Sequence, residues 1–165
     1  MTQSLPQMAH EHHGRLLHNV DGLPAMADSL MTATSDEARA SLAGTRAFLE
    51  GTLLAHMDAA EKTIYPELER MFQNRHSMAP MRREHAEIRR LVAEFAAAAD
   101  KQVTEPLTLG RTLVVRRTVF QLYALLKIHL AEEEAYLRIV ERGIPADVAD
   151  VLAAAMDHPV AGAAG

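Results

Sequence analysis

The sequence predicts an all-α protein, an antiparallel up-down-up-down four-helix bundle with a short fifth helix near the C-terminus. Strong helix formers (Ala, Leu, Glu, Arg and Met) dominate the 165 residues, whereas aromatic residues make up 4% and Trp is absent. Apolar residues also recur at helical spacing along four long segments, and the breaks between these segments are short. Amphipathic helices joined by short loops pack most simply as a bundle.

The first helix begins at Ser4 and Pro6, because serine caps helices and proline is tolerated in the first turn. Pro24 lies inside this helix and predicts a kink or a break there. The apolar residues at helical spacing are Leu16, Leu17, Val20, Leu23, Met26 and Leu30. The second helix begins after a capping segment at residues 34–37, and Pro66 interrupts its last part. Its inward residues are Leu42, Phe48, Leu49, Leu53, His56, Ile64, Leu68 and Phe72.

The third helix begins at residues 77–80, and its apolar face consists of Met81, His85, Ile88, Val92, Phe95 and Ala99. The fourth begins at residues 104–106, ends at Gly143, and directs inward Leu122, Leu125, Leu126, His129, Tyr136, Leu137 and Val140. Residues 147–156 can form the short fifth helix. We expect a single domain over residues 1–165, with its core at 8–142 and a C-terminal helix and tail at 146–165.

The composition excludes several classes of protein. Without cysteine, the chain has no disulfide framework, thiolate zinc site or iron–sulfur cluster. A formal net charge of −5 gives no general attraction to nucleic acid or to an anionic membrane. The chain has no apolar run of about 18 residues to span a membrane, and its N-terminus lacks the layout of a signal peptide. We therefore expect a cytoplasmic protein with neither nucleic acid nor membrane as a partner.

Each of the four long helices carries one histidine on its apolar face, and these are His13, His56, His85 and His129. Glu133 follows His129 by one turn on the same face. A single histidine on such a face is usually a hydrogen-bonded core residue. Four of them, joined by carboxylates, would cost several kcal/mol for each buried charge left unpaired. A metal site in the bundle core is the simplest explanation.

The residue types narrow the choice of metal. Imidazole and carboxylate without sulfur suit iron, manganese or zinc. Four histidines and two glutamates are too many for one tetrahedral zinc, and they fit two metals roughly 3.5–4 Å apart. Each metal would hold two imidazoles and share two bridging carboxylates, and open positions would remain for water, an oxo bridge or a diatomic ligand.

The order of these motifs resembles the hemerythrin-like (HHE cation-binding) family over about residues 8–142. The resemblance rests on a histidine in the first helix, His56 followed by Ile64-Tyr65-Pro66, then His85, and then His129-Leu-Ala-Glu-Glu133. It implies a non-heme di-iron site, with a possible oxo or hydroxo bridge, that binds or reacts with oxygen, peroxide or nitric oxide. The Glu-x-x-His spacing of ferritin-like proteins is absent from the chain.

The second helix departs from the usual His-x-x-x-Glu of this family. The fourth residue after His56 is Ala60, and the carboxylate arrives one residue later at Glu61. A π-type bulge between His56 and Glu61 would turn Glu61 inward, in keeping with a one-residue shift of the apolar face. Alternatively, the gap at Ala60 is filled by Asp58, a water molecule or the Tyr65 phenolate. We prefer Glu61.

A second departure concerns Arg89, which stands where the oxygen carriers of this family have a second histidine four residues after His85. This favours reaction with oxygen or peroxide, or iron sensing or storage, over oxygen carriage. His12 competes with His13 as the ligand of the first helix, and the hydrophobic spacing favours His13. Glu84 and Glu132 are candidates to accept hydrogen bonds from ligating imidazoles.

The resulting prediction is a non-heme di-iron protein. Its expected ligands are His13, His56, His85 and His129 as terminal imidazoles, with Glu61 and Glu133 as bridges. The expected cofactors are two iron ions, with zinc or manganese as substitutes. A peroxide-decomposing or oxidase activity is one outcome. The alternatives are an iron- or oxygen-responsive sensing module without turnover, and a bundle with a purely structural metal.

Overall fold

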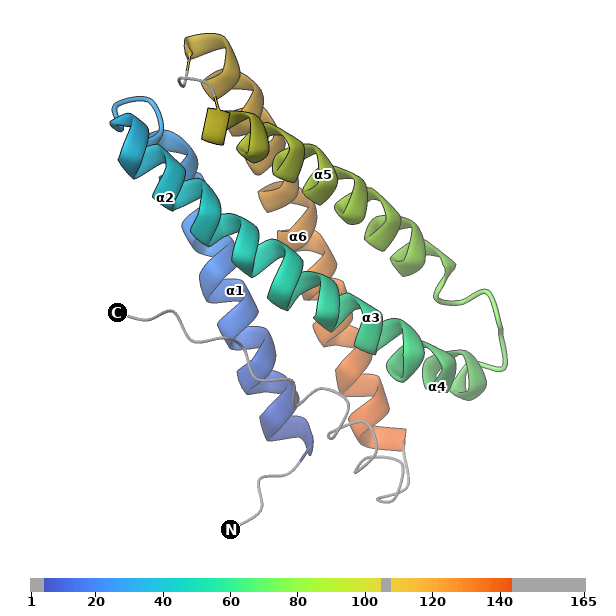
Figure 1. Cartoon of the computed structure of the whole chain (residues 1–165). Helices are drawn as coiled ribbons and strands as arrows, with labels where there is room; N and C mark the ends of the chain where they lie inside the picture. The colour runs from blue at the N-terminus through green and yellow to red at the C-terminus, as the bar shows by residue number, and fades with distance from the viewer. Residues whose placement is uncertain (1–4, 105–107, 144–165) are drawn as a thin grey trace.

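A computed structural model of the protein describes residues 5–104 and 108–143, and every regular element within them is a helix (Figure 1). The helices are α1 (Leu5–Ser29), α2 (Ser35–Arg46), the π-helix η1 (Ala47–Leu53), α3 (Leu54–Lys62), α4 (Ile64–Met71), α5 (Ala79–Thr104) and α6 (Leu109–Gly143). The predicted all-helical fold class is thereby confirmed. The C-terminal helix and tail predicted at residues 146–165 lie outside the described residues.

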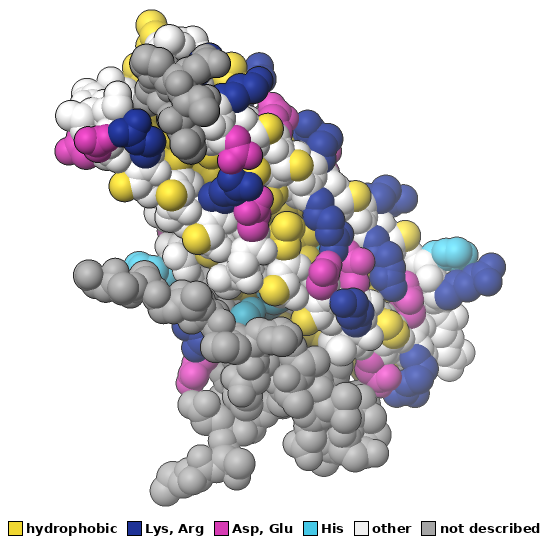
Figure 2. All heavy atoms as spheres, viewed as in Figure 1, with side chains coloured by type: hydrophobic (Ala, Val, Ile, Leu, Met, Phe, Trp, Pro, Cys, Tyr) yellow, Lys and Arg dark blue, Asp and Glu magenta, His cyan; other side chains and the backbone are white. Residues whose placement is uncertain are grey.

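The helices are arranged as four rods that form a helical bundle. The elements α2, η1, α3 and α4 follow one another along a single rod, and α1, α5 and α6 are the other three (Figure 1). The rod α6 packs against both α1 and α5, and α2 packs against α5. On the face that Figure 2 shows, basic and acidic side chains are interspersed, and neither sign forms a continuous patch.

Two clusters of buried apolar side chains fill the bundle. The larger one draws residues from α1, α2, η1, α3, α5 and α6, and the smaller one includes Ile64, Tyr65 and Leu68 of α4. On two helices a buried polar residue stands between these clusters along the chain: on α5, His85 lies between Met81 of the smaller cluster and Ile88 of the larger one. On α6, Glu133 lies between Leu130 of the larger cluster and Leu137 of the smaller one. A polar layer thus separates two apolar ones.

The break predicted at Pro24 does not occur, because α1 continues through this residue to Ser29. Proline removes one hydrogen bond of the helix, but the side chains that follow it are well packed. Ala27 and Leu30 are both buried in the larger cluster. Packing against neighbouring rods therefore holds the end of α1 in place.

The π-helical winding lies about two turns upstream of its predicted position. It covers Ala47–Leu53, and the backbone N–H of Leu54 bonds to the carbonyl of Leu49 five residues earlier. The prediction of a bulge between His56 and Glu61 was wrong, because α3 is a regular α-helix there. Two leucines of this segment, Leu49 and Leu53, are fully buried in the core.

A break between α3 and α4 agrees with the predicted effect of Pro66. The helix leaves α-geometry at Thr63, whose backbone φ is −122°, and α4 begins at Ile64 with Pro66 in its first turn. The hydroxyl of Thr63 donates to the carbonyl of Ala59 at 2.7 Å and closes the end of α3. After this break, Ile64 and Tyr65 are both buried in the bundle.

Candidate metal centre

Five buried polar side chains from all four rods meet in the layer between the two apolar clusters. They are His13 of α1, His56 of α3, His85 of α5, and His129 and Glu133 of α6. Their donor atoms form two groups within which all atoms lie within 4.8 Å of one another, and Glu133 belongs to both groups. Five of the six predicted ligand residues are thus brought together.

The first group consists of His13, His56 and Glu133. The Nε2 atom of His56 lies 2.8 Å from Oε2 of Glu133, and Nε2 of His13 lies 3.5 Å from the same oxygen. The Nε2 atom of His13 is buried but makes no hydrogen bond. Buried polar atoms rarely lack a partner, so this nitrogen fits a cation bound between the three side chains.

The second group consists of His85, His129 and Glu133. The two Nε2 atoms of its imidazoles face each other at 3.0 Å. The hydroxyl of Tyr65 lies 3.1 Å from Nε2 of His85 and donates to Oε1 of Glu133 at 3.4 Å. Two imidazole nitrogens, a carboxylate and a phenol are suitable donors for iron, manganese or zinc.

The opposite ring nitrogens are held by an outer set of side chains. Three of the imidazoles contact a carboxylate through Nδ1, and the pairs are His13 with Glu134 at 3.2 Å, His85 with Glu61 at 2.7 Å and His129 with Glu84 at 2.8 Å. A hydrogen bond at Nδ1 fixes the ring orientation and leaves Nε2 free for a metal, as is usual for ligating histidines. The acceptor role that was predicted for Glu84 is observed, whereas Glu132 is exposed on α6.

The fourth imidazole has a different outer partner. Nδ1 of His56 lies 3.1 Å from Nε2 of His12, which is itself buried on α1. The sequence offers His12 as an alternative to His13, and otherwise as an exposed residue or one that contacts a ligand from outside. Neighbouring residues on a helix point about 100° apart, and both rings are nevertheless buried. This role could have been recognised from the adjacent His12 and His13 in the sequence, because two neighbouring histidines on a buried helix face can contact two different side chains.

Glu61, which was predicted as a bridging ligand, is not brought into either group. Because α3 is a regular α-helix, Ala60 faces the core after His56, and Glu61 points toward α5 with its side chain 28% exposed. Its Oε1 atom contacts Nδ1 of His85 at 2.7 Å and the Arg89 guanidinium at 2.9 Å. Glu61 therefore contacts the Nδ1 side of His85, opposite the Nε2 atom that faces the centre.

The two side chains considered as alternatives to Glu61 differ in burial and in the residues that they contact. Asp58 is 54% exposed and pairs with Arg89 at 2.7 Å on the surface. Tyr65, in contrast, is fully buried and directs its hydroxyl toward His85 and Glu133. Among the side chains considered for the gap at Ala60, it is Tyr65 that reaches the two groups.

The charges of these residues depend strongly on one another. Burial raises the pKa of the Glu133 carboxyl, but the charges of His56 and His13 outweigh this and lower the pKa well below its usual value. Burial opposes protonation of His13, but the nearby carboxylates of Glu133 and Glu134 outweigh this effect and raise its pKa. Burial and the nearby charge of Glu133 raise the pKa of the Tyr65 hydroxyl. Without a metal, the centre thus holds a carboxylate and a neutral phenol.

Two histidines resist protonation in the folded protein. Burial and the neighbouring His56 lower the pKa of His12 to about 4, and burial and His129 lower the pKa of His85 to about 4. In the unfolded chain both titrate near 6.5. Between these values the unfolded state binds more protons, so the stability of the metal-free protein falls as the pH decreases from 6.5 to 4.

We therefore expect the Tm of the metal-free protein to fall steadily between pH 7 and pH 4.5. The raised pKa of His13 opposes this trend in part, since its contribution to stability is present below pH 6.5 and is lost as the pH rises. Thermal unfolding at several pH values measures the effect. The variant His76→Gln, altered at an exposed residue, is the control and should show the same decrease. A constant Tm over this range would contradict the expectation.

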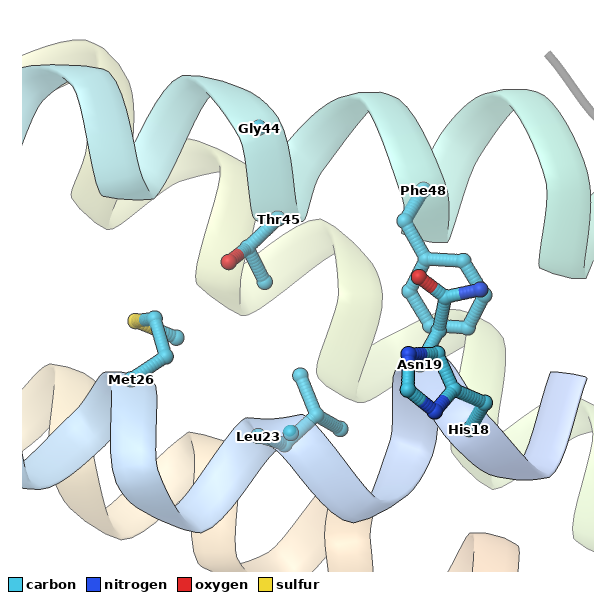
Figure 3. Close-up of a pocket in the computed structure, with 8 residues that line it drawn as sticks. His18, Asn19, Leu23, Met26, Gly44, Thr45 and Phe48 are labelled. Atoms are coloured by element: carbon cyan, nitrogen blue, oxygen red, sulfur yellow. The ribbon is translucent and has the colours of Figure 1, made fainter. Parts of the chain in front are cut away.

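The other hollows described in the structure hold no comparable set of donors. One of about 260 Å³ lies between α1 and α2, and Figure 3 shows Leu23, Met26 and Phe48 among its lining residues, with His18 at one end. Within the described residues, the two groups around Glu133 are the clusters suited to a metal ion. No helix in this part of the chain is both long and apolar enough to cross a membrane.

Comparison with known families agrees with this centre. The model of the hemerythrin HHE cation binding domain matches residues 6–137, a range that includes both groups. No curated protein and no solved structure gives a significant match. Because the match covers most of the chain, the protein belongs to the hemerythrin HHE cation-binding domain family.

Proposed function

We propose that the protein binds two iron ions side by side in the bundle core. The observation that carries this proposal is the sharing of Glu133 by two groups of imidazoles. A buried carboxylate that faces histidines on two sides is suited to bridge two cations. Imidazole and carboxylate donors favour iron, with zinc or manganese as substitutes. The proposal includes the antiparallel order of the four rods, which would bring one imidazole from each rod to the same level.

The residues that would hold the ions follow from the two groups. His13 and His56 would bind one ion, His85 and His129 would bind the other, and Glu133 would bridge them. Tyr65 would serve as an additional donor beside His85, since its hydroxyl is already within 3.1 Å of Nε2. Glu61 would orient His85 from behind. In this assignment Glu133 is the bridging carboxylate, and the phenol of Tyr65 takes the place in the ligand set that was expected for Glu61.

Bound iron with open coordination positions supplies redox chemistry toward oxygen, peroxide or nitric oxide. The chain itself contributes a layer enclosed by two apolar clusters, which limit the access of bulk water. The hydroxyl of Tyr65 keeps its proton and donates a hydrogen bond to Oε1 of Glu133. The presence of Arg89, which pairs with Glu61 and Asp58, leaves fewer imidazoles than an oxygen carrier would use. We therefore propose reaction with a small oxidant, in the cytoplasm, over reversible carriage.

The proposal is tested by loading the metal-free protein with ferrous iron under nitrogen and counting the iron bound per chain. Two ions are expected, and peroxide should then change the absorption spectrum. Sustained oxygen release indicates an enzyme, and a single spectral change indicates a binding or sensing module. A change in Tm without any spectral response indicates a structural metal.

The variant His129→Ala should lose at least one of the two ions. The control is His76→Ala, which removes an exposed histidine that contacts Arg75 in the loop before α5. An unchanged iron content in His129→Ala would refute the assignment of this ligand.

A further inference from the structure

We propose that the two cation positions differ in affinity: the position at His85 and His129 fills first, and the position at His13 and His56 is the weaker one. This inference rests on the proposed binding of two ions at the groups that share Glu133. The difference arises from the residues behind the imidazoles, and above all from His12.

Both imidazoles of the stronger position are backed by carboxylates. Nδ1 of His85 contacts Glu61 at 2.7 Å, and Nδ1 of His129 contacts Glu84 at 2.8 Å. Such short contacts are typical of charge-assisted hydrogen bonds. Arg89 offsets part of this charge, but it is also paired with Asp58. Two carboxylates therefore contact the imidazoles of this position, and one guanidinium is shared between Glu61 and Asp58.

The weaker position has less negative charge behind it. Nδ1 of His13 contacts Glu134 at the longer distance of 3.2 Å, and Glu134 also pairs with Arg138 at 3.5 Å. Among the described residues, the Nδ1 partner of His56 is not a carboxylate but the imidazole of His12, at 3.1 Å. For Nε2 of His56 to bind a cation, its proton must be on Nδ1. Nδ1 then donates a hydrogen bond to Nε2 of His12. His12 then acts as a neutral acceptor.

The charge of these outer partners affects the metal directly. A carboxylate at Nδ1 raises the basicity of a ligating imidazole, and loss of such a partner typically lowers metal affinity by 10–100-fold. Tyr65 adds a further donor beside His85 at the stronger position. We therefore expect the two dissociation constants to differ by about 10–100-fold. His12 is a positioning residue, since it acts on the cation through His56.

A titration of the metal-free protein with Zn²⁺, as a redox-inactive probe, tests the inference by calorimetry in the presence of a competing chelator. Two binding steps are expected, with the tighter one first. The variant His13→Ala should lose the weaker step and keep the tighter one, whereas His129→Ala should do the reverse. Equal affinities, or loss of the tighter step in His13→Ala, would overturn the inference and leave the binding of two ions intact.

The role of His12 is tested by two substitutions, one to a charged acceptor and one to a neutral acceptor. His12→Glu supplies a carboxylate behind His56 and should tighten the weaker step by about 10-fold. His12→Gln retains a neutral acceptor and should preserve the two-step pattern, which makes it the matched control. Circular dichroism checks that both variants fold. An unchanged weaker step in folded His12→Glu would count against the proposed role.

A test independent of His12 uses the stronger position. Glu84→Gln removes the charge behind His129 and should weaken the tighter step by about 10–100-fold, which narrows the gap between the two steps. No change in that step would overturn the inference. Failure of the unmodified protein to bind any Zn²⁺ or iron would instead refute the proposed function on which the inference rests.

Discussion

Glu133→Gln is expected to remove both ions from the protein, whereas loss of a single histidine should affect mainly one. Glu133 is the one residue common to the two groups of metal-ligating side chains, and its carboxylate carries the charge that lies between four imidazoles. The amide of glutamine has nearly the same size but no charge, and its nitrogen is a donor that cannot bind a cation. Iron per chain should fall from two to near zero.

The same substitution should also lower the free energy of unfolding of the metal-free protein. In the native chain the buried Glu133 contacts His56 at 2.8 Å, and breaking a buried pair typically costs about 3–5 kcal/mol. Glutamine can still accept a hydrogen bond from His56, so the helices should remain. Metal analysis after reconstitution measures the first effect, and circular dichroism with chemical denaturation measures the second.

The matched control is Glu132→Gln, because Glu132 is adjacent in sequence but exposed on α6. Its iron content should equal that of the unmodified protein. Retention of two tightly bound ions by Glu133→Gln would show that the shared carboxylate is not a bridge, and it would contradict the proposed centre.

Removal of the bound ions by a chelator is expected to lower the Tm by about 10 °C. A ligand present at 1,000 times its dissociation constant stabilises the folded state by about 4 kcal/mol, and for a chain of this size each kcal/mol shifts the Tm by about 2–4 °C. The effect should be large because the metal would join all four rods through His13, His56, His85 and His129.

Calorimetric unfolding of the loaded and chelated protein measures this difference. The Glu133→Gln variant is the control, since its Tm should be insensitive to the chelator. Identical Tm values for the loaded and chelated native chain would mean that the ions do not link the rods.

Much of the centre could be predicted because helical periodicity determines which side chains share a face. The spacing of four residues between His129 and Glu133 places both on the inner side of α6, and the structure buries both completely. A histidine on each apolar face could be recognised in the same way. The break that Pro66 introduces follows from its missing N–H, and it is found just before, at Thr63.

The position of Glu61 could not be derived in this way. Periodicity reports where the apolar face shifts, but not where the backbone absorbs that shift. The π-turn lies at Ala47–Leu53, where Leu49 and Leu53 are buried, and not after His56. Because α3 is a regular α-helix, the side chain of Glu61 points away from the two groups of ligands. The outer partners Glu134 and His12 depend on contacts between α1, α3 and α6 that no single helix specifies.

The π-helical segment η1 also determines how the chain tolerates changes of length. It accommodates one residue more than α-helical winding of the same rise would need, just before the turn that bears His56. Deletion of one residue between Ala47 and Leu53 would remove this extra residue, return the segment to ordinary α-helical winding, and leave the two flanking parts of the rod in the same relative orientation. A single-residue deletion should thus be tolerated in η1, whereas a deletion within the regular helix α3 would rotate the residues on its two sides by about 100° relative to each other.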